Sequence, residues 1–369
     1  MEQVLKKGEQ AVFALRKIYE QYGYLPYKMS RFEEYELYVR NKDFLVSDRV
    51  ITFSDTDGRL LALKPDVTLS IIKNAKDVPG SVQKLYYNEN VYRPGKAEQG
   101  FREILQAGLE CVGDLDAYEI REVVLLAAKS LEALNHPYIL DISHMGLIQS
   151  VLKRSGLEGV QQKQAMAFLR QKNSHEMRKL CEDTGCECGD LLVAFTQVYG
   201  NPADVFSQIK SLLKTEEEKA SLEELEGICQ MLSDLGYGDR VQVDFSVGSD
   251  MKYYSGVVFK GYLEGLPVGI LSGGAYDKLL KKMGRPGKAV GFALYLDMLE
   301  RYDENSVGFS VDMLLLYSNA DDTNAVMQLC EKLRENGSVL ASKVIPENLK
   351  WKKKVQFING EAVEDGADA

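Results

Sequence analysis

LYYNENVYRPGKAEQGFREILQAGLECVG, residues 85–113, decides the fold of this chain. Its two alternating segments flank a charged loop, which predicts two strands joined by that loop. Alternation along the second strand divides its residues between a polar face with a glycine gap (Ile104, Gln106, Gly108, Glu110) and an apolar face (Leu105, Ala107, Leu109, Cys111). A ligand platform needs acceptors at fixed spacing and room for the ligand, so we favour a binding site here. An ordinary solvated strand face is the alternative.

Composition indicates a globular chain of two or more domains. The chain has 369 residues, 45% of them hydrophobic and 27% charged, and this length exceeds the usual size of one core. The formal net charge of -10 argues against nonspecific nucleic-acid binding by the whole surface, although a local basic patch could still bind RNA. The sequence contains no apolar run of about 18 residues, so it predicts no membrane span. The N-terminus also lacks the apolar core of a signal peptide. We therefore expect a cytoplasmic protein.

Cysteine and histidine usage favours neither a metal centre nor a hydrolase. Six cysteines in a long chain without a secretory signal predict reduced thiols. Cys181, Cys186 and Cys188 come nearest to a metal pattern, but their spacing is irregular and free thiols are the preferred interpretation over zinc. No recognisable nucleophile motif contains any of the three histidines, which are His136, His144 and His175. We expect no cofactor, no metal and no catalytic residue of these classes.

The first third of the chain predicts an amphipathic helix over residues 2–22 and then a β-hairpin over residues 50–64. Asp57-Gly58 is expected to form the hairpin as a tight primed turn. Pro65 ends the second strand because it cannot donate a ladder hydrogen bond, and residues 66–68 then open a helix with free N–H groups. Asp66 and Thr68 can be read as simple helix caps or as ligand-binding residues.

The remaining chain predicts a core, an inserted helical segment and a small C-terminal module. Residues 116–134 read as a helix backing the sheet, and residues 145–235 are almost wholly helical in pattern. Two later segments carry possible site features, a Tyr253-Tyr254 pair and a Gly273-Gly274 turn, whose glycines would permit close backbone approach to a ligand. The tail reads as strand, helix and strand over 307–358, followed by a disordered acidic end at 360–369.

The pattern of the opening stretch resembles motif 2 of class II aminoacyl-tRNA synthetases, most closely the histidyl branch. It is carried by Arg93, Gly100, Arg102, Glu103, Gln106, Gly108 and Glu110. The resemblance implies an α+β fold, with a class II synthetase-like antiparallel sheet flanked by helices, a helical insertion and a small C-terminal α/β module. The implied boundaries are 1–144 and 236–303 for the core, 145–235 for the insertion and 304–369 for the module. It also places motif 1, the dimerisation element, at residues 24–38.

Further matches imply a pocket for histidine. LKPDVT at 63–68 is similar to the family's Leu-Arg-Pro-Glu-x-Thr element, which contacts the amino group of the amino acid, and Asp for Glu keeps the anion. Tyr253 and Tyr254 match the paired tyrosines of a second family motif, although Tyr-Tyr in a strand is often cross-strand packing. The implied histidine-binding residues are Asp66, Thr68, Gln106 and Glu110 for the amino group and imidazole, Arg93 for the carboxylate, and Tyr253 and Tyr254 to close the pocket.

The resemblance fails at positions that handle nucleotide and developing charge. Family arginines are replaced by Gly100, Ser249, Ala275 and Met298, the Asp of the Tyr-Tyr motif is replaced by Lys252, and a motif 3 glycine is replaced by Tyr295. A triphosphate carries several charges that need fixed cations or metal. We therefore expect a chain that binds or once bound histidine without activating it.

This combination is similar to the regulatory subunit family of short-form ATP phosphoribosyltransferase. That resemblance implies a non-catalytic chain that joins the catalytic subunit in a hetero-octamer, activates it, and confers feedback inhibition by histidine in the first step of histidine biosynthesis. It also implies a homodimer through the core. From the lack of an apolar run and the net negative charge, we expect neither a membrane nor tRNA as a partner. Two alternatives stay open: a divergent histidyl-tRNA synthetase, and a synthetase-like RNA- or protein-binding regulator that uses the basic residues 350–354.

Overall fold

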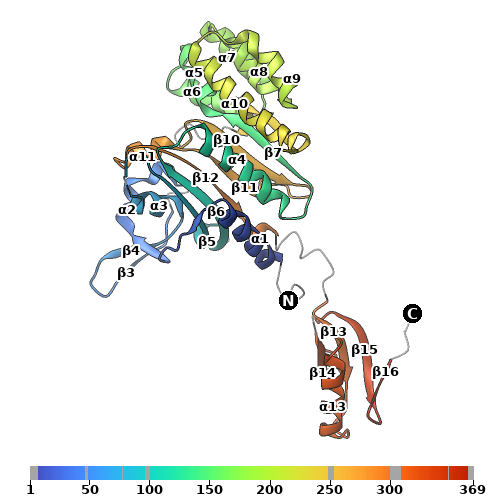
Figure 1. The fold of residues 1–369 in the computed structure, drawn as a ribbon. Helices are drawn as coiled ribbons and strands as arrows, with labels where there is room; N and C mark the ends of the chain where they lie inside the picture. The colour runs from blue at the N-terminus through green and yellow to red at the C-terminus, as the bar shows by residue number, and fades with distance from the viewer. Residues whose placement is uncertain are drawn as a thin grey trace. The chain divides into compact units, whose positions relative to one another are not determined.

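A computed structural model describes residues 7–45, 49–76, 78–95, 100–247, 253–299, 309–347 and 349–364. The chain separates into two compact units, residues 1–300 and residues 301–369. Each unit has its own sheet and its own core (Figure 1).

The first unit is built on a nine-stranded sheet with the order β1-β5-β6-β12-β11-β10-β7-β9-β8. Its longest ladder joins β5 (Val82–Pro94) to β6 (Phe101–Gly113) in antiparallel register, and β12 (Lys288–Tyr295) pairs with the other edge of β6. The two strands expected over residues 85–113 are therefore confirmed, and residues 96–99 of their loop lie outside the described residues. The other strands are β1 (Leu25–Pro26), β7 (Tyr138–His144), β8 (Tyr199–Gly200), β9 (Val241–Asp244), β10 (Val257–Leu263) and β11 (Leu271–Ala275).

One face of this sheet is covered by α1 (Lys7–Gln21) and α4 (Ala117–Glu132) (Figure 1). Asp116 begins α4 with a capping box, in which its side chain accepts from the backbone and Glu119 bonds back to the cap. The apolar residues of β6 point into the core beneath these helices, as the alternation predicted; they are Leu105, Ala107, Leu109 and Cys111. This packing leaves the opposite face of β6 for a second, smaller core and the candidate site.

The second face carries a three-stranded sheet, β2 (Phe32–Glu34), β4 (Leu60–Leu63) and β3 (Thr52–Ser54), with α2 (Tyr35–Arg40), η1 (Lys42–Phe44), α3 (Thr68–Asn74) and α11 (Asp277–Lys282). The β3–β4 hairpin forms as expected, but its turn is not the primed turn. Gly58 has positive φ (80°) and Asp57 does not. Asp55 instead builds a longer loop, because its carboxylate accepts from the backbone N–H groups of Asp57 (2.9 Å) and Arg59 (2.8 Å).

Residues 145–240 form a bundle of short helices joined to the sheet by β7 and β9 (Figure 1). Its elements are α5 (Met145–Arg154), α6 (Val160–Arg170), α7 (Ser174–Thr184), α8 (Gly189–Gln197), α9 (Pro202–Ile209), η2 (Lys210–Leu212), α10 (Glu216–Asp234) and η3 (Gly238–Arg240), with η4 (Phe245–Val247) following β9. Its apolar side chains belong to the same core as the helices that cover the sheet. The bundle is thus packed onto the synthetase-like sheet.

The second unit is a four-stranded sheet with one helix, in the order β14-β13-β15-β16. Its elements are β13 (Val311–Leu316), α13 (Thr323–Arg334), β14 (Val339–Ser342), β15 (Trp351–Ile358) and β16 (Glu361–Glu364). The prediction of a disordered acidic end is wrong for Glu361–Glu364, which pair with β15 in antiparallel register. A tight turn at Asn359 and Gly360, both with positive φ, makes this hairpin possible. Residues 365–369 lie outside the described residues.

A buried ion pair at the start of α10 holds the bundle together. Glu218 is fully buried (0% exposed), and Arg154 of α5 bonds it at 2.7 and 3.3 Å. Glu218 also closes the capping box with Thr215 and accepts from the N–H of Lys214 at 2.8 Å. Although burial raises the pKa of Glu218, Arg154 and these N–H groups lower it more, so the net pKa is below its ordinary value.

Replacement of Glu218 by Ala is expected to destabilise the chain by about 3 kcal/mol, because it strands Arg154 and two capping N–H groups. Chemical denaturation measures this free energy of unfolding. The exposed neighbour Glu217→Ala is the matched control and should change stability by less than about 0.5 kcal/mol. If both variants lost the same free energy of unfolding, the proposed contribution of the ion pair to stability would be contradicted.

Candidate functional site

The residues that the sequence singled out converge on one cavity of about 190 Å³ on the second face of the sheet. Its floor is formed by β5, β6, β11 and β12, and the start of α3 and residues 253–254 form its walls. All seven expected binding residues line it: Asp66, Thr68, Arg93, Gln106, Glu110, Tyr253 and Tyr254. The chain thus assembles one site from positions almost 190 residues apart in sequence.

Glu110 is a buried carboxyl group that lines the cavity (2% exposed). The Thr68 hydroxyl donates to its Oε1 at 2.7 Å, and the Tyr276 hydroxyl donates to its Oε2. Burial raises the pKa of Glu110 to about 8, against the two hydrogen bonds, which lower it. Gly291 on the neighbouring strand makes room for this carboxyl, since a Cβ there would lie 1.8 Å from Oε2. The site therefore holds a carboxyl group that changes charge near neutral pH.

Asp66 and Arg93 form a second, more open part of the site. Asp66 Oδ1 accepts from the backbone N–H of Leu69 at 2.9 Å, while its Oδ2 lies 4.0 Å from an Arg93 nitrogen. Desolvation raises the pKa of Asp66, and Arg93 opposes this increase. Arg93 is further fixed because its Nε donates to the carbonyl of Pro65 at 2.9 Å. Asp66 thus braces the start of α3 and also faces the cavity, so the two interpretations of this residue are compatible.

Gln106 supplies an amide to the same cavity. Its side chain is buried (2% exposed), and its Nε2 has no hydrogen-bond partner among the residues that the structure describes. A buried amide donor without a partner costs about 1–3 kcal/mol, so a polar ligand that accepts from it recovers that free energy. Gln106 therefore presents an amide N–H without a partner to the cavity.

Tyr253 and Tyr254 precede β10 instead of lying in it, so the cross-strand alternative for this pair is wrong. Their rings meet edge to face, with centroids 4.8 Å apart, and Tyr253 also packs near Tyr276 (5.6 Å) and Phe44 (5.9 Å). Thr68 hydrogen-bonds Tyr253, and burial raises the pKa of its phenol well above the ordinary value. The result is an aromatic wall beside the Glu110 carboxyl.

The glycines of the site serve strand packing, which corrects the interpretation that they leave room for a ligand. A Cβ at Gly108 would lie 2.6 Å from the Tyr87 hydroxyl and 2.2 Å from the Phe292 carbonyl oxygen, so the expected gap is already filled. At Gly273 and Gly274 a Cβ would meet Phe292 at 2.4 Å and the Val257 carbonyl at 2.6 Å. Close approach occurs here between protein segments.

Several site residues were not predicted from the sequence. The cavity is also lined by Phe44, Leu45, Tyr87, Ser272, Tyr276, Phe292, Ala293 and Tyr295. Tyr87 lies directly opposite Gly108 in the antiparallel register, a pairing that the sequence of either strand alone does not give. Tyr276 follows the Gly273-Gly274 turn by two residues, but nothing in the spacing shows that its hydroxyl reaches Glu110 across the sheet.

The replaced family positions add little positive charge to the cavity. Among its described lining residues, Arg93 is the only cation. Met298 is half-buried, Ala275 is buried and Gly100 is exposed, while Ser249 and Lys252 lie outside the described residues.

Two other cations of the motif segments, Lys64 and Arg102, are engaged in ion pairs. Lys64 is buried (1% exposed) and bonds Glu89 at 2.5 Å, while Arg102 pairs with Asp297 at 3.2 Å. Lys64 thus fixes β4 against β5, and neither side chain lines the cavity.

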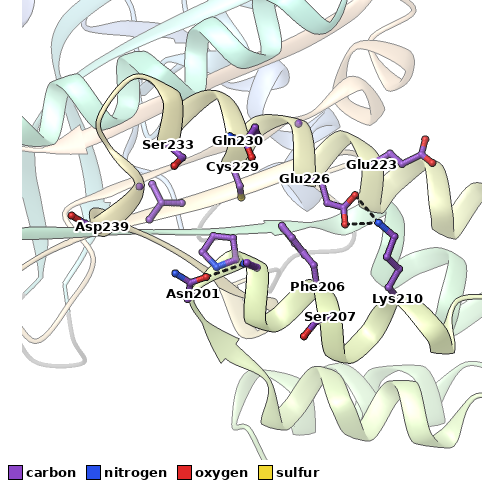
Figure 2. A pocket seen from close by; sticks show the side chains of 15 residues that line it. Asn201, Phe206, Ser207, Lys210, Glu223, Glu226, Cys229, Gln230, Ser233 and Asp239 are labelled. Atoms are coloured by element: carbon purple, nitrogen blue, oxygen red, sulfur yellow. Dashed lines mark hydrogen bonds and ion pairs between the residues drawn. The ribbon is translucent and has the colours of Figure 1, made fainter.

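A larger cavity, of about 860 Å³, lies between α9, α10 and η3 (Figure 2). Lys210 and Glu226 pair across it at 3.1 and 3.3 Å, and Glu223 and Asp239 lie on its exposed rim. None of the expected binding residues lines it. Because its carboxylates are exposed or paired, this groove lacks the converging buried polar groups of the smaller cavity, which is the better candidate site.

All six cysteines are free thiols, and the Sγ atoms of Cys186 and Cys188 lie 3.7 Å apart. Burial raises the pKa of Cys181 and Cys188 to about 12, which disfavours their thiolates. Within the described residues, no cluster of three or more His, Cys, Asp or Glu side chains is arranged to hold a metal ion. The helices in the described ranges include none with the length and apolarity to span a membrane.

Comparison with known proteins connects this fold to synthetases and their relatives. The family model described as histidyl-tRNA synthetase matches residues 2–299. Among curated relatives, the ATP phosphoribosyltransferase regulatory subunit of Alkaliphilus metalliredigens is 29% identical over 288 residues, covering 76% of this chain and 72% of the relative. The protein of the same name from Clostridium kluyveri is 26% identical over 352 residues, covering 91% of this chain and 89% of the relative.

Solved structures show the same fold. A Bacillus halodurans ATP phosphoribosyltransferase regulatory subunit/histidyl-tRNA synthetase superposes with a TM-score of 0.74 at 23% identity, covering 95% of this chain and 93% of that one. A chain of the ATP phosphoribosyl transferase complex from Thermotoga maritima gives a TM-score of 0.63 at 19% identity, covering 78% of this chain and 97% of that one.

Glu110 is expected to make the stability of the chain fall as the pH rises from 5 to 8. The unfolded carboxyl ionises near its ordinary pKa of 4.5, whereas the folded carboxyl keeps its proton up to about pH 8. Between these values the folded state binds more protons, so stability is greatest below the unfolded pKa and is lost as the pH rises. Thermal unfolding at several pH values should therefore show a smaller loss for Glu110→Gln than for the wild type.

The exposed Glu187→Gln variant is the control for the loss of one carboxyl group, and it should retain the wild-type pH dependence. If Glu110→Gln follows the same pH profile as the wild type, the carboxyl of Glu110 is not held protonated in the fold.

Proposed function

The chain belongs to the histidyl-tRNA synthetase family, and we propose that it acts as the regulatory subunit of a short-form ATP phosphoribosyltransferase. The observation that carries the proposal is the cavity itself: its buried groups suit a free amino acid, whereas the cations that a triphosphate needs are replaced. The names of the curated relatives support the same role.

Histidine fits the polarity of the cavity at both ends. Asp66 offers a carboxylate for the ammonium group, and Arg93 offers a guanidinium for the carboxylate of the amino acid. Gln106 adds an amide donor without a partner in the described structure. These three groups recognise the backbone of an α-amino acid without reference to its side chain.

Glu110 and the aromatic wall distinguish imidazole from other side chains. Imidazole has an ordinary pKa near 6.5, and the pKa of Glu110 is raised to about 8, so the two groups can share a proton near neutral pH. Thr68 and Tyr276 hold the carboxyl in place, while Tyr253 and Tyr254 supply rings for packing. A purely apolar side chain would leave the Glu110 carboxyl buried without a ligand partner.

Adenylate chemistry is not supported by the same cavity. The described lining contains one cation, Arg93. Charge development in amino-acid activation needs several fixed cations or metal ions. We propose that the chain binds histidine as an effector and that a partner subunit performs the phosphoribosyl transfer.

The charges of two segments, residues 201–240 and 350–354, do not favour RNA binding. Residues 201–240 contain nine acidic and four basic residues, so this part of the helical bundle repels phosphates. In the basic segment 350–354, Lys352 pairs with Asp312 and Lys353 pairs with Glu364. The homodimer and the hetero-octamer with the catalytic subunit remain predictions of this proposal.

Phosphoribosyl-ATP formation by the short catalytic subunit from the same genome tests the proposal. Adding this chain should activate that subunit, and histidine should reverse the activation. Glu110→Ala should raise the histidine concentration for half-inhibition by at least about tenfold, because a charge-assisted contact of about 1.5–3 kcal/mol is lost. Glu187→Ala, on the exposed surface, should behave as the wild type.

A chain that neither binds nor activates the catalytic subunit would overturn the regulatory proposal. Histidine-dependent exchange of pyrophosphate into ATP by this chain alone would instead establish synthetase chemistry. Activation that Glu110→Ala leaves fully sensitive to histidine would keep the regulatory role but place the effector site elsewhere.

A further inference from the structure

Tyr295 lies at the end of β12, where the strand leaves the candidate site. Its Cα is paired with Gln106, so the two side chains share the cavity face of the sheet, and Tyr295 lines the cavity. The two preceding residues on that face, Gly291 and Ala293, are small. Tyr295 is therefore the first bulky side chain that β12 places on the floor of the site.

The ring of Tyr295 meets Arg93 across the intervening strand. Strand β6 lies between β5, which carries Arg93, and β12, which carries Tyr295. The guanidinium carbon is nevertheless 5.8 Å from the centre of the Tyr295 ring, within the range of a cation–π contact. Together the two side chains cross over β6, on the side of Gln106 nearer to the β5–β6 loop.

The Arg93–Tyr295 pair is fixed in place. Arg93 donates to the Pro65 carbonyl at 2.9 Å and lies 4.0 Å from Asp66, so it is held from the wall of the cavity as well as by the tyrosine. The cavity measures about 190 Å³, below the roughly 300–1,000 Å³ of pockets that hold larger organic ligands. A ligand that continued from the amino-acid pocket along β6 would have to displace the ring or the guanidinium.

We propose that Tyr295 is a specificity-determining residue that restricts the site to a free amino acid and excludes an amino acid joined to a nucleotide through its carboxylate. The inference rests on the proposed function, because it takes histidine as the ligand of the cavity. The ring acts by volume: it occupies the path that a group attached to the ligand carboxylate would follow past Arg93. A glycine at this position would leave that path open.

Isothermal titration of the full-length chain with two probes tests this role. The probes are L-histidine and a non-hydrolysable histidyl-adenylate analogue with a sulfamoyl linkage. For the wild type we expect histidine to bind and the analogue to bind more weakly. In Tyr295→Gly the affinity for the analogue relative to histidine should rise by at least about tenfold, a change of about 1.4 kcal/mol.

Tyr295→Phe is the matched variant, since it keeps the ring and removes the hydroxyl. It should retain the wild-type preference for histidine if volume excludes the nucleotide. Tyr295→Ala serves where the glycine variant does not fold, as judged by thermal unfolding, and it should shift the ratio in the same direction.

The outcomes separate this inference from the proposed function. If neither probe binds the wild type, the histidine site itself is refuted. If histidine binds the wild type and the analogue binds equally well, or if the ratio is unchanged in both Tyr295→Gly and Tyr295→Ala, the site is supported and the role of Tyr295 is overturned.

Discussion

The buried carboxyl of Glu110 is the constraint on which the site depends. A carboxyl group inside a sheet must be hydrogen-bonded or protonated, because burial of an unpaired charge is costly. Here its two oxygens are bonded by hydroxyls from separate segments, Thr68 at the start of α3 and Tyr276 before α11. Gly291 must also lack a side chain for the carboxyl to fit. Strand β6, two helix starts and β12 are therefore positioned by one acidic group.

One face of the β5–β6 ladder packs against the large core and the other lines the cavity, and the two faces depend on each other. The apolar residues of β6 are buried under α1 and α4, which fixes the strand register through the large core. A slip by one residue would turn Gln106 and Glu110 into that core and Leu109 toward the cavity. The cost of burying those polar groups without partners excludes the slip, so packing on one face determines the geometry of the other.

Much of this arrangement could be predicted from local patterns, and the failures have a common physical cause. Alternation in residues 104–111 identified both faces of β6, and the motif matches identified the side chains that converge on the cavity. The sequence of one strand does not show which residues of the neighbouring strand lie beside it. Gly108 was interpreted as room for a ligand, but the register places Tyr87 opposite it. The last strand, β16, was missed because its charges suggested disorder, whereas pairing with β15 satisfies its backbone.

Arg93 is the only cation among the described lining residues of the cavity, and its charge needs partners. A largely buried, unpaired arginine is destabilising. Arg93 avoids this state because the Pro65 carbonyl, Asp66 and the ring of Tyr295 surround it. The tyrosine that stands at a glycine position of the family pattern therefore has two physical effects, since it fills space and also stabilises a charge. Such a site is complete without a nucleotide, which is the property that the proposed function requires of a subunit that binds an amino acid without activating it.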